Sequence, residues 1–169
     1  MNATVRFQET KLDELASRCR AQGVPLTLQR RVTLEVLAGR SDHPTADQIY
    51  EAVTARYPGI SRTTVYRVME TFVQLGVARK ISNPEAKARY DADTRRHHHL
   101  ICCACDQVTD YSSDELDRIA LPPEIGNGFA VSDYSLIVTG LCNRCRKVNS
   151  PSTSSGRSDA RQYPQRRRI

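Results

Sequence analysis

The sequence contains no run of apolar residues long enough to cross a bilayer, which requires about 18 consecutive apolar positions. Its first residues, MNATVRFQETKLDELASRC, also lack the apolar segment of a secretory signal, so we expect a cytoplasmic protein. Thiols stay reduced in that compartment, and the six cysteines are therefore not expected to form structural disulfides. The length of 169 residues suits one average domain or two small ones.

Charge is distributed unevenly along the chain, whose formal net charge is +6. Residues 1–89 carry 14 basic and 9 acidic side chains, whereas residues 90–148 carry 6 basic and 9 acidic ones. Residues 149–169 carry 5 basic and 1 acidic side chain among many Ser and Pro residues, which predicts a disordered basic tail. A basic first half before an acidic second half favours contact of the first half with a polyanion.

Four helices are predicted in the first half, and each begins at a hydroxyl residue that can cap it. The predicted caps are Thr10, Thr27, Thr45 and Ser61, and Gln48 completes a capping box with Thr45. Apolar residues at helical spacing give each helix one buried face. These predicted inward residues are Leu12, Leu15, Ala16, Cys19, Leu28, Val32, Val36, Ile49, Ala52, Val53, Val65, Val68, Met69, Phe72 and Leu75.

The third and fourth helices are joined by a short turn at residues 58–60, which is the form of a helix-turn-helix. Two β-like segments follow at 77–81 and 88–91, with turn-forming residues between them. A helix-turn-helix followed by a β-hairpin indicates a winged helix. A plain helical bundle with a surface hairpin is the alternative.

From residue 97 onward the apolar pattern changes to a period of two. Strands are predicted at 99–102 and 107–111, on either side of a tight cysteine turn. Ser113 can cap a short helix, and residues 129–141 indicate one or two further strands. The fold class is therefore α+β, with a small α/β domain whose sheet edges favour pairing with a second copy.

Four cysteines form two matched CxxC pairs, Cys102 with Cys105 and Cys142 with Cys145, separated by 36 residues. Each turn aims two thiolates at one point, and two such turns make a tetrahedral site suited to structural Zn²⁺. In a domain of about 60 residues, the ion substitutes for a large core. A thiol redox switch and a rubredoxin-like iron site are the alternatives. Cys103 is out of register with these pairs.

A second candidate site has harder ligands. On a strand, His97 and His99 point to one face and can chelate together, whereas His98 points to the other face. Further candidate donors are His43, Asp91 and Asp110. Nitrogen and carboxylate donors suit Fe²⁺, Mn²⁺ or Zn²⁺. From spacing alone, His43 and Asp91 are equally consistent with solvated loop residues.

Six segments together resemble the ferric uptake regulator (Fur) family over roughly residues 10–148. They are LTLQRRVTLEVL, DHPTADQIYEAV, SRTTVYRVMETFVQLGVARKI, ARYDAD, HHHLICCACDQVTDY and LCNRCRK. The resemblance implies a dimeric, metal-dependent transcription factor with an N-terminal winged-helix DNA-binding domain (1–88) and a dimerisation domain (89–148). It implies structural zinc at Cys102, Cys105, Cys142 and Cys145, and regulatory Fe²⁺ or Mn²⁺ at His43, Asp91, His97, His99 and Asp110.

Four positions bear on the branch of the family. Asp110 favours a peroxide-sensing, PerR-like member, because iron-sensing members usually have Glu there. The extra metal site of many iron sensors needs donors where this chain has Arg96 and Tyr134, and Arg96 cannot act as a ligand. Zinc-sensing members often use a Cys ligand near the wing, which here ends in Asp91. An iron-responsive repressor of metal uptake genes is the first alternative, and a zinc-responsive member is the second.

Outward residues near the start of the fourth helix are predicted to read base edges in the major groove. The predicted DNA contacts are Arg30, Arg62, Thr63, Thr64, Tyr66, Arg67 and Lys80, with Arg30 and Lys80 on phosphates. One ion bound by ligands from both halves would hold the fourth helices of a homodimer about 34 Å apart, the spacing that a palindromic operator requires. The resemblance implies that peroxide, reduced at iron, adds oxygen to His43 or His97 and releases metal and DNA.

Two other classes of function compete with this interpretation. An enzyme would use the nitrogen and oxygen ligands and an open position to activate water, but no nucleophile motif or separate general base is visible. We therefore expect no enzymatic activity. A constitutive DNA-binding protein that holds only the structural zinc would keep its full DNA affinity after His43→Ala and His97→Ala.

Overall fold

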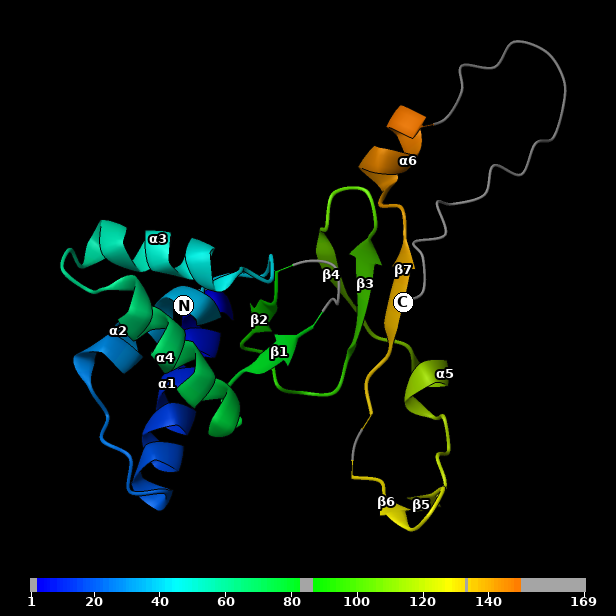
Figure 1. Cartoon of the computed structure of the whole chain (residues 1–169), viewed down its shortest axis with the longest axis horizontal. Coiled ribbons are helices and arrows are strands. Elements are labelled where there is room, and N and C mark those ends of the chain that lie inside the picture. Colours follow the sequence, from blue (N-terminus) through cyan, green and yellow to red (C-terminus); the bar gives the residue numbers. More distant parts are fainter. Residues whose placement is uncertain (1–2, 83–86, 133, 150–169) are drawn as a thin grey trace, which may run out of the picture.

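A computed structural model describes residues 3–82, 87–132 and 134–149, and places a helical unit beside a sheet unit (Figure 1). The helical unit comprises α1 (Ala3–Ala21), α2 (Leu28–Ala38), α3 (Ala46–Arg56), α4 (Arg62–Gln74), β1 (Arg79–Ile81) and β2 (Arg89–Asp91). The sheet unit comprises β3 (His98–Cys102), β4 (Val108–Tyr111), α5 (Asp114–Asp117), β5 (Glu124–Ile125), β6 (Phe129–Ala130), β7 (Ile137–Gly140) and α6 (Asn143–Asn149). No helix in these ranges is long and apolar enough to span a membrane.

Three of the predicted caps in the helical unit are confirmed. The Thr27 side chain accepts a hydrogen bond from the backbone N–H of Arg30 at the start of α2, and Ser61 caps α4 in the same way. Thr45 and Gln48 form a reciprocal capping box at the start of α3, with bonds of 3.3 and 2.9 Å. These side chains satisfy backbone N–H groups that the first helical turn leaves without partners.

Two details of the predicted helices were wrong. Helix α1 begins at Ala3 rather than after Thr10, whose hydroxyl donates to the carbonyl oxygen of Arg6 at 2.9 Å, one turn earlier. Thr10 therefore lies inside the helix, where its hydroxyl bonds back to the backbone. Leu28, predicted to face inward, is 64% exposed, because it is the first residue of α2 and the buried face begins at Val32.

The helical unit has a continuous core drawn from all four helices and the hairpin. Leu15, Leu34, Ile49 and Phe72 are fully buried in it, and Tyr90 of β2 closes one side. Strands β1 and β2 pair antiparallel directly after α4. The helix-turn-helix of α3 and α4 with this hairpin confirms the winged helix, although residues 83–86 of the predicted loop lie outside the described residues.

The sheet unit is built on three strands in the order β4-β3-β7, with β3 antiparallel to β4 and parallel to β7. Its own apolar core is small: only Ile101 and Val108 join Ile81 of the wing in a buried cluster of the described residues. The region predicted to hold one or two strands contains both β6 and β7. Helix α6, which begins between the two cysteines of the second pair, was not predicted. The tail expected at 149–169 lies outside the described residues from residue 150 onward.

Candidate functional site

The connection between α2 and α3 places His43 against the end of the wing. The backbone N–H of Tyr90 donates to the carbonyl oxygen of Pro44 at 3.0 Å, and the Arg89 guanidinium donates to that of His43, also at 3.0 Å. His43 itself has a φ of 50°, in the left-handed region that non-glycine residues seldom adopt. The fold therefore holds this side chain, only 3% exposed, in one costly backbone conformation.

Asp91, the last residue of β2, presents one carboxylate oxygen to the same place. Its Oδ1 accepts a hydrogen bond from the backbone N–H of Asp93 at 2.8 Å, which fixes the side chain. Oδ2 then lies 3.0 Å from Nε2 of His97. Burial opposes ionisation of Asp91, but the nearby His99 ring and the hydrogen bond from the backbone N–H of Asp93 outweigh it, and the pKa of the carboxyl is lowered. Asp91 is thus prepared as an anion.

Strands β3 and β4 supply the remaining donors. Nδ1 of His97 lies 2.9 Å from the carbonyl oxygen of Arg95, and a proton on Nδ1 leaves Nε2 with its lone pair toward the cluster. The Nε2 atoms of His97 and His99 are 3.0 Å apart. Asp110 stands opposite His99 in the antiparallel register, and its Oδ1 is 2.7 Å from Nε2 of His43.

These five side chains offer ligand atoms that all lie within 4.8 Å of one another, and four of the five are buried. His43 and Asp91 come from the helical unit, and the other three from β4 and the segment that ends in β3. Both ring nitrogens of His43 and Oδ2 of Asp91 are buried without a hydrogen-bond partner of correct geometry. Unsatisfied buried polar atoms are costly, and a cation would satisfy them together. The donor set therefore fits a divalent metal ion.

His98 is separated from this cluster, as the alternation of side chains along a strand predicts. Its ring is fully buried, with Nε2 3.3 Å from Oδ1 of Asp117 and Nδ1 accepting from the backbone N–H of Leu136. The guanidinium of Arg96 lies 4.3 Å from the centre of the Tyr134 ring. A cation–π pair thus occupies the two positions where the family resemblance would place donors of an extra metal site.

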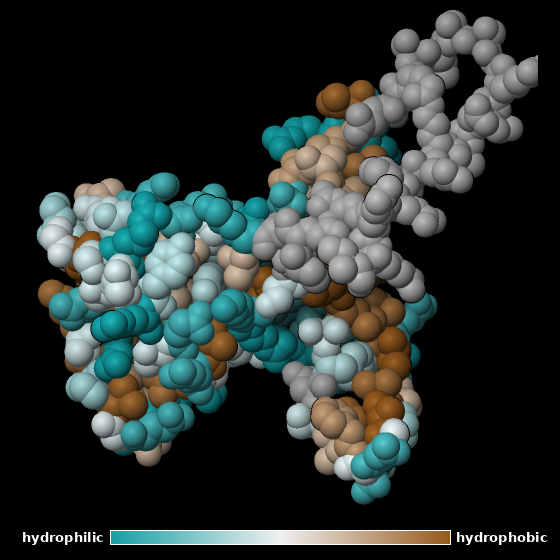
Figure 2. Space-filling model, in the orientation of Figure 1, coloured by the Kyte–Doolittle hydropathy of each residue, from teal (hydrophilic) through white to brown (hydrophobic). Residues whose placement is uncertain are grey.

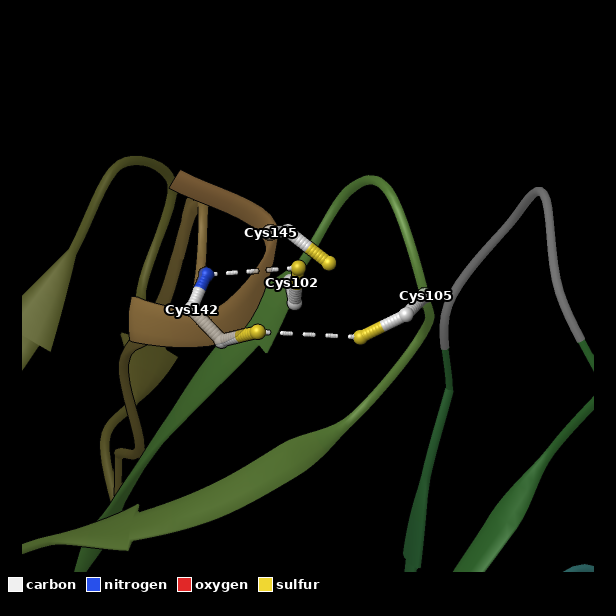
Figure 3. A group of neighbouring side chains, drawn as sticks. All are labelled: Cys102, Cys105, Cys142 and Cys145. Atoms are coloured by element: carbon white, nitrogen blue, oxygen red, sulfur yellow. Dashed lines mark hydrogen bonds between the residues drawn. The ribbon is translucent and has the colours of Figure 1, made fainter. Parts of the chain in front are cut away.

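The second cluster joins the two CxxC turns. Ligand atoms of Cys102, Cys105, Cys142 and Cys145 lie within 4.8 Å of one another, and Figure 3 shows the four sulfur atoms converging. The first pair lies at the end of β3 and in the turn after it, and the second lies at the start of α6 (Figure 3). Four sulfur donors suit Zn²⁺ in a closed tetrahedral site.

The thiols in this cluster oppose one another's ionisation. Burial raises the pKa of Cys102, but backbone N–H groups, first that of Cys142, outweigh it and lower the pKa to about 6. The neighbouring sulfur of Cys142 raises the pKa of Cys145 to about 12. Adjacent thiolates repel each other, so all four ionise together only around a cation. The cluster therefore fits a metal ion better than a set of free thiols.

The predicted DNA contacts are distributed over α2, α4 and β1 of the helical unit. On α4, Thr63, Tyr66 and Arg67 are exposed, whereas the hydroxyl of Thr64 is 2.8 Å from Ser61 Oγ within the cap. The guanidinium of Arg30, on α2, donates to the carbonyl oxygen of Pro25. The Lys80 ammonium on β1 pairs with Glu70 at 3.1 Å.

Asp47, in the first turn of α3, was missed by sequence reasoning. Its carboxylate accepts hydrogen bonds from the Arg62 guanidinium, from the Tyr66 hydroxyl at 3.0 Å and from the Lys87 ammonium at 2.8 Å. The pattern T-A-D-Q identified only the capping box around it. Only the packing of α3 against α4 and the wing reveals the role of Asp47, because its partners are 15, 19 and 40 residues away in sequence.

Comparison with known proteins identifies the family of this chain. A model of the ferric uptake regulator family matches residues 21–139. The peroxide-responsive repressor PerR of Staphylococcus epidermidis is 29% identical over 147 residues, covering 87% of this chain and 98% of that protein. PerR of Staphylococcus aureus (strain USA300) is 30% identical over 146 residues, covering 86% and 99%.

A solved structure has the same fold. The Helicobacter pylori ferric uptake regulator Fur matches with a TM-score of 0.70 at 17% identity, covering 85% of this chain and 96% of that one. At that identity the likeness shows a common fold. The family model covers more than half of the chain, and the PerR relatives match almost from end to end. This chain belongs to the ferric uptake regulator family.

Proposed function

We propose that this protein is a metal-dependent, DNA-binding transcriptional repressor that responds to peroxide. One observation carries the proposal: candidate ligands from both structural units meet within 4.8 Å of one another. It is further supported by relatives named peroxide-responsive repressors, which share 29 and 30% of aligned residues. We assign no enzymatic activity to the chain.

The regulatory ion is proposed to bind His43, Asp91, His97, His99 and Asp110. The proposed DNA-binding domain spans residues 1–88 and the dimerisation domain spans residues 89–148, so these ligands lie on both sides of the division. An ion that prefers the closed arrangement shifts the population toward it, by about 1.4 kcal/mol for each tenfold difference in affinity. Zinc at Cys102, Cys105, Cys142 and Cys145 keeps the second domain folded in either arrangement.

The proposed partner on the sheet unit is a second copy of the chain. Several apolar residues of this unit are exposed, and Figure 2 shows apolar side chains gathered along the side that carries β7. They include Leu100, Ile119, Leu121, Ile125, Phe129, Ile137 and Val138. Such a surface favours burial against another protein, because contiguous exposed apolar area is uncommon on monomers. A symmetric dimer presents two α4 helices to a palindromic operator.

Peroxide has a route to the proposed regulatory site. A cavity of about 720 Å³ borders His43, Asp91 and Asp110 and is also lined by residues of α1. Fe²⁺ held by these five side chains would supply reducing electrons for a peroxide beside the ligand rings, so that one peroxide oxygen adds to a ring carbon and the other leaves as water. His43 and His97 are the proposed targets, since an oxygen added to either ring disturbs a ligand. The four cysteines are proposed bystanders, protected as zinc thiolates.

The test begins with a DNA duplex that the Mn²⁺-loaded protein selects from a random pool. Binding to that duplex is then measured with Mn²⁺, Fe²⁺ or Zn²⁺, with and without peroxide, followed by peptide mass analysis. We expect peroxide to abolish binding of the Fe²⁺ protein and to add oxygen to His43 or His97, and to leave the Mn²⁺ protein active. An Fe²⁺ protein that keeps its DNA affinity and unmodified histidines would overturn the peroxide-sensing role.

A matched pair of variants tests the bridging ion itself. Asp91→Asn removes a carboxylate that faces the histidines, and Asp93→Asn removes one that pairs with Arg95 instead. We expect Asp91→Asn to weaken Mn²⁺ binding by at least about tenfold and to lower metal-dependent DNA affinity in parallel. The Asp93→Asn protein should behave like the wild type. Equal behaviour of the two variants contradicts a bridging regulatory ion.

A further inference from the structure

On the face proposed to meet DNA, the carboxylate of Asp47 contacts two cations and a phenol. Asp47 Oδ1 accepts from the Tyr66 hydroxyl and from the Arg62 guanidinium, while Oδ2 accepts from the Lys87 ammonium. Arg62 and Tyr66 lie on the predicted reading helix α4, and Lys87 lies just before β2 of the wing. A single side chain of α3 therefore holds groups from both DNA-contacting elements of a winged helix.

Exposure differs sharply within this group. The Asp47 side chain is 19% exposed, whereas those of Arg62 and Lys87 are 57% and 75% exposed. The carboxylate is thus recessed, and the cations lie outside it with open surface toward solvent. A phosphate or a base edge approaching this face meets the cations first, and their positions are already fixed from behind by Asp47.

The orientation of Arg62 has a second support. Its guanidinium lies 4.8 Å from the centre of the Tyr50 ring, so it is held between an aromatic face and the carboxylate. The hydrogen bond from Tyr66 to Asp47 raises the pKa of the phenol, and that from Lys87 lowers the pKa of Asp47, as expected for a charged carboxylate with neutral and cationic donors. Each partner therefore contributes to one fixed arrangement.

We propose that Asp47 is a positioning residue that fixes Arg62, Tyr66 and Lys87 for sequence-selective DNA recognition and reduces non-selective attraction to DNA. The inference rests on the proposed DNA-binding function. The charge argument gives its direction: the carboxylate cancels one positive charge near the phosphates, which weakens binding to any sequence. Fixing these side chains increases the selectivity of DNA binding, because a flexible guanidinium or ammonium can adapt to many arrangements of acceptors.

The central variant is Asp47→Asn, which keeps the size and one acceptor oxygen but removes the charge. The matched control is Glu51→Gln, which removes an equal charge from an exposed position of the same helix. Both proteins are loaded with Mn²⁺ and titrated at several salt concentrations against two duplexes. One is the duplex that the wild type selects from a random pool, and the other is a scrambled duplex of equal length.

We expect Asp47→Asn to bind the scrambled duplex about fivefold more tightly than the wild type does. The slope of its log affinity against log salt concentration should be steeper by about the amount that one phosphate contact contributes. Its discrimination between the two duplexes should fall by about tenfold, while Glu51→Gln keeps the wild-type discrimination. Thermal unfolding of each variant checks that the helical unit is intact. An Asp47→Asn protein that stays folded and loses affinity for both duplexes equally overturns a positioning role.

A second variant keeps the proposal testable if Asp47→Asn alters folding. Tyr66→Phe removes one hydroxyl, and its loss of discrimination should not fully add to that of Asp47→Asn, since removing the charge weakens the same bond that removing the hydroxyl eliminates. Unchanged discrimination in Asp47→Asn, or strictly additive effects in the double variant, contradicts the inference. If the wild-type protein with Mn²⁺ fails to discriminate between the duplexes, the proposed function itself fails.

Discussion

The helical unit and the sheet unit of this protein are stabilised in different ways. In the first, residues from four helices and a hairpin form one continuous apolar core, with Leu15, Ile49 and Phe72 fully buried. In the second, Ile101 and Val108 are the members of the buried apolar cluster, together with Ile81 of the wing. Small domains with little core need another source of stability, such as a metal ion or a partner. The four-cysteine cluster is placed to supply it.

Loss of the cysteine site should therefore have the largest effect, and one confined to the sheet unit. Structural zinc contributes roughly 10–16 kcal/mol of apparent binding free energy in small domains. We expect Cys142→Ser to remove amide-exchange protection from β3, β4 and β7, and to leave α2, α3 and α4 protected. Cys103→Ser, beside the cluster but outside it, should keep its zinc and its protection. Loss of protection in both units would contradict the comparison.

Truncation of a side chain in the helical core should destabilise the helical unit and leave the sheet unit unaffected. Phe72→Ala removes a fully buried ring and should lower the free energy of unfolding of the helical unit by about 3–5 kcal/mol, measured by denaturant titration. Zinc content should stay the same, because the cysteines lie in the other unit. Leu28→Ala, at a position 64% exposed, is the control and should cost less than about 0.5 kcal/mol.

The smallest expected effect concerns a helix cap. Thr45→Ala removes the side chain that accepts from the Gln48 N–H at the start of α3, and should lower the free energy of unfolding by about 1 kcal/mol. Thr54→Ala, in the same helix, loses only a bond to its own preceding turn and should be nearly neutral. Equal losses in the two variants would show that the cap adds nothing beyond the general effect of removing a threonine.

Local signals in the sequence were sufficient for much of this structure. The capping box at Thr45, the turn before Ser61 and the two CxxC pairs act within a few residues, and each lies where its pattern predicted. Separation of His98 from its two neighbours followed from strand alternation alone. The ligand cluster itself required the family resemblance, because His43, Asp91 and Asp110 are brought together by tertiary packing.

Other features had no local signal. The start of α1 was misplaced because Thr10, a residue type favoured at caps, forms a bond to the preceding turn inside the helix. The role of Asp47 depends on partners up to 40 residues away, and an acidic residue in a first helical turn is common for reasons of the helix dipole. Such long-range contacts become visible only in three dimensions.

Strand β3 has a consequence for how the two proposed ions influence each other. His99 and Cys102 are three positions apart on this strand, a distance of roughly 10 Å, so one short segment presents donors to both clusters. An ion that orders one end reduces the entropy still to be lost when the other end is filled. If both ions bind as proposed, the two binding equilibria are linked, and reciprocity requires the regulatory ion to raise the affinity for zinc by the same factor by which zinc raises the affinity for the regulatory ion. A cell short of zinc would lose sensitivity to its second signal as well.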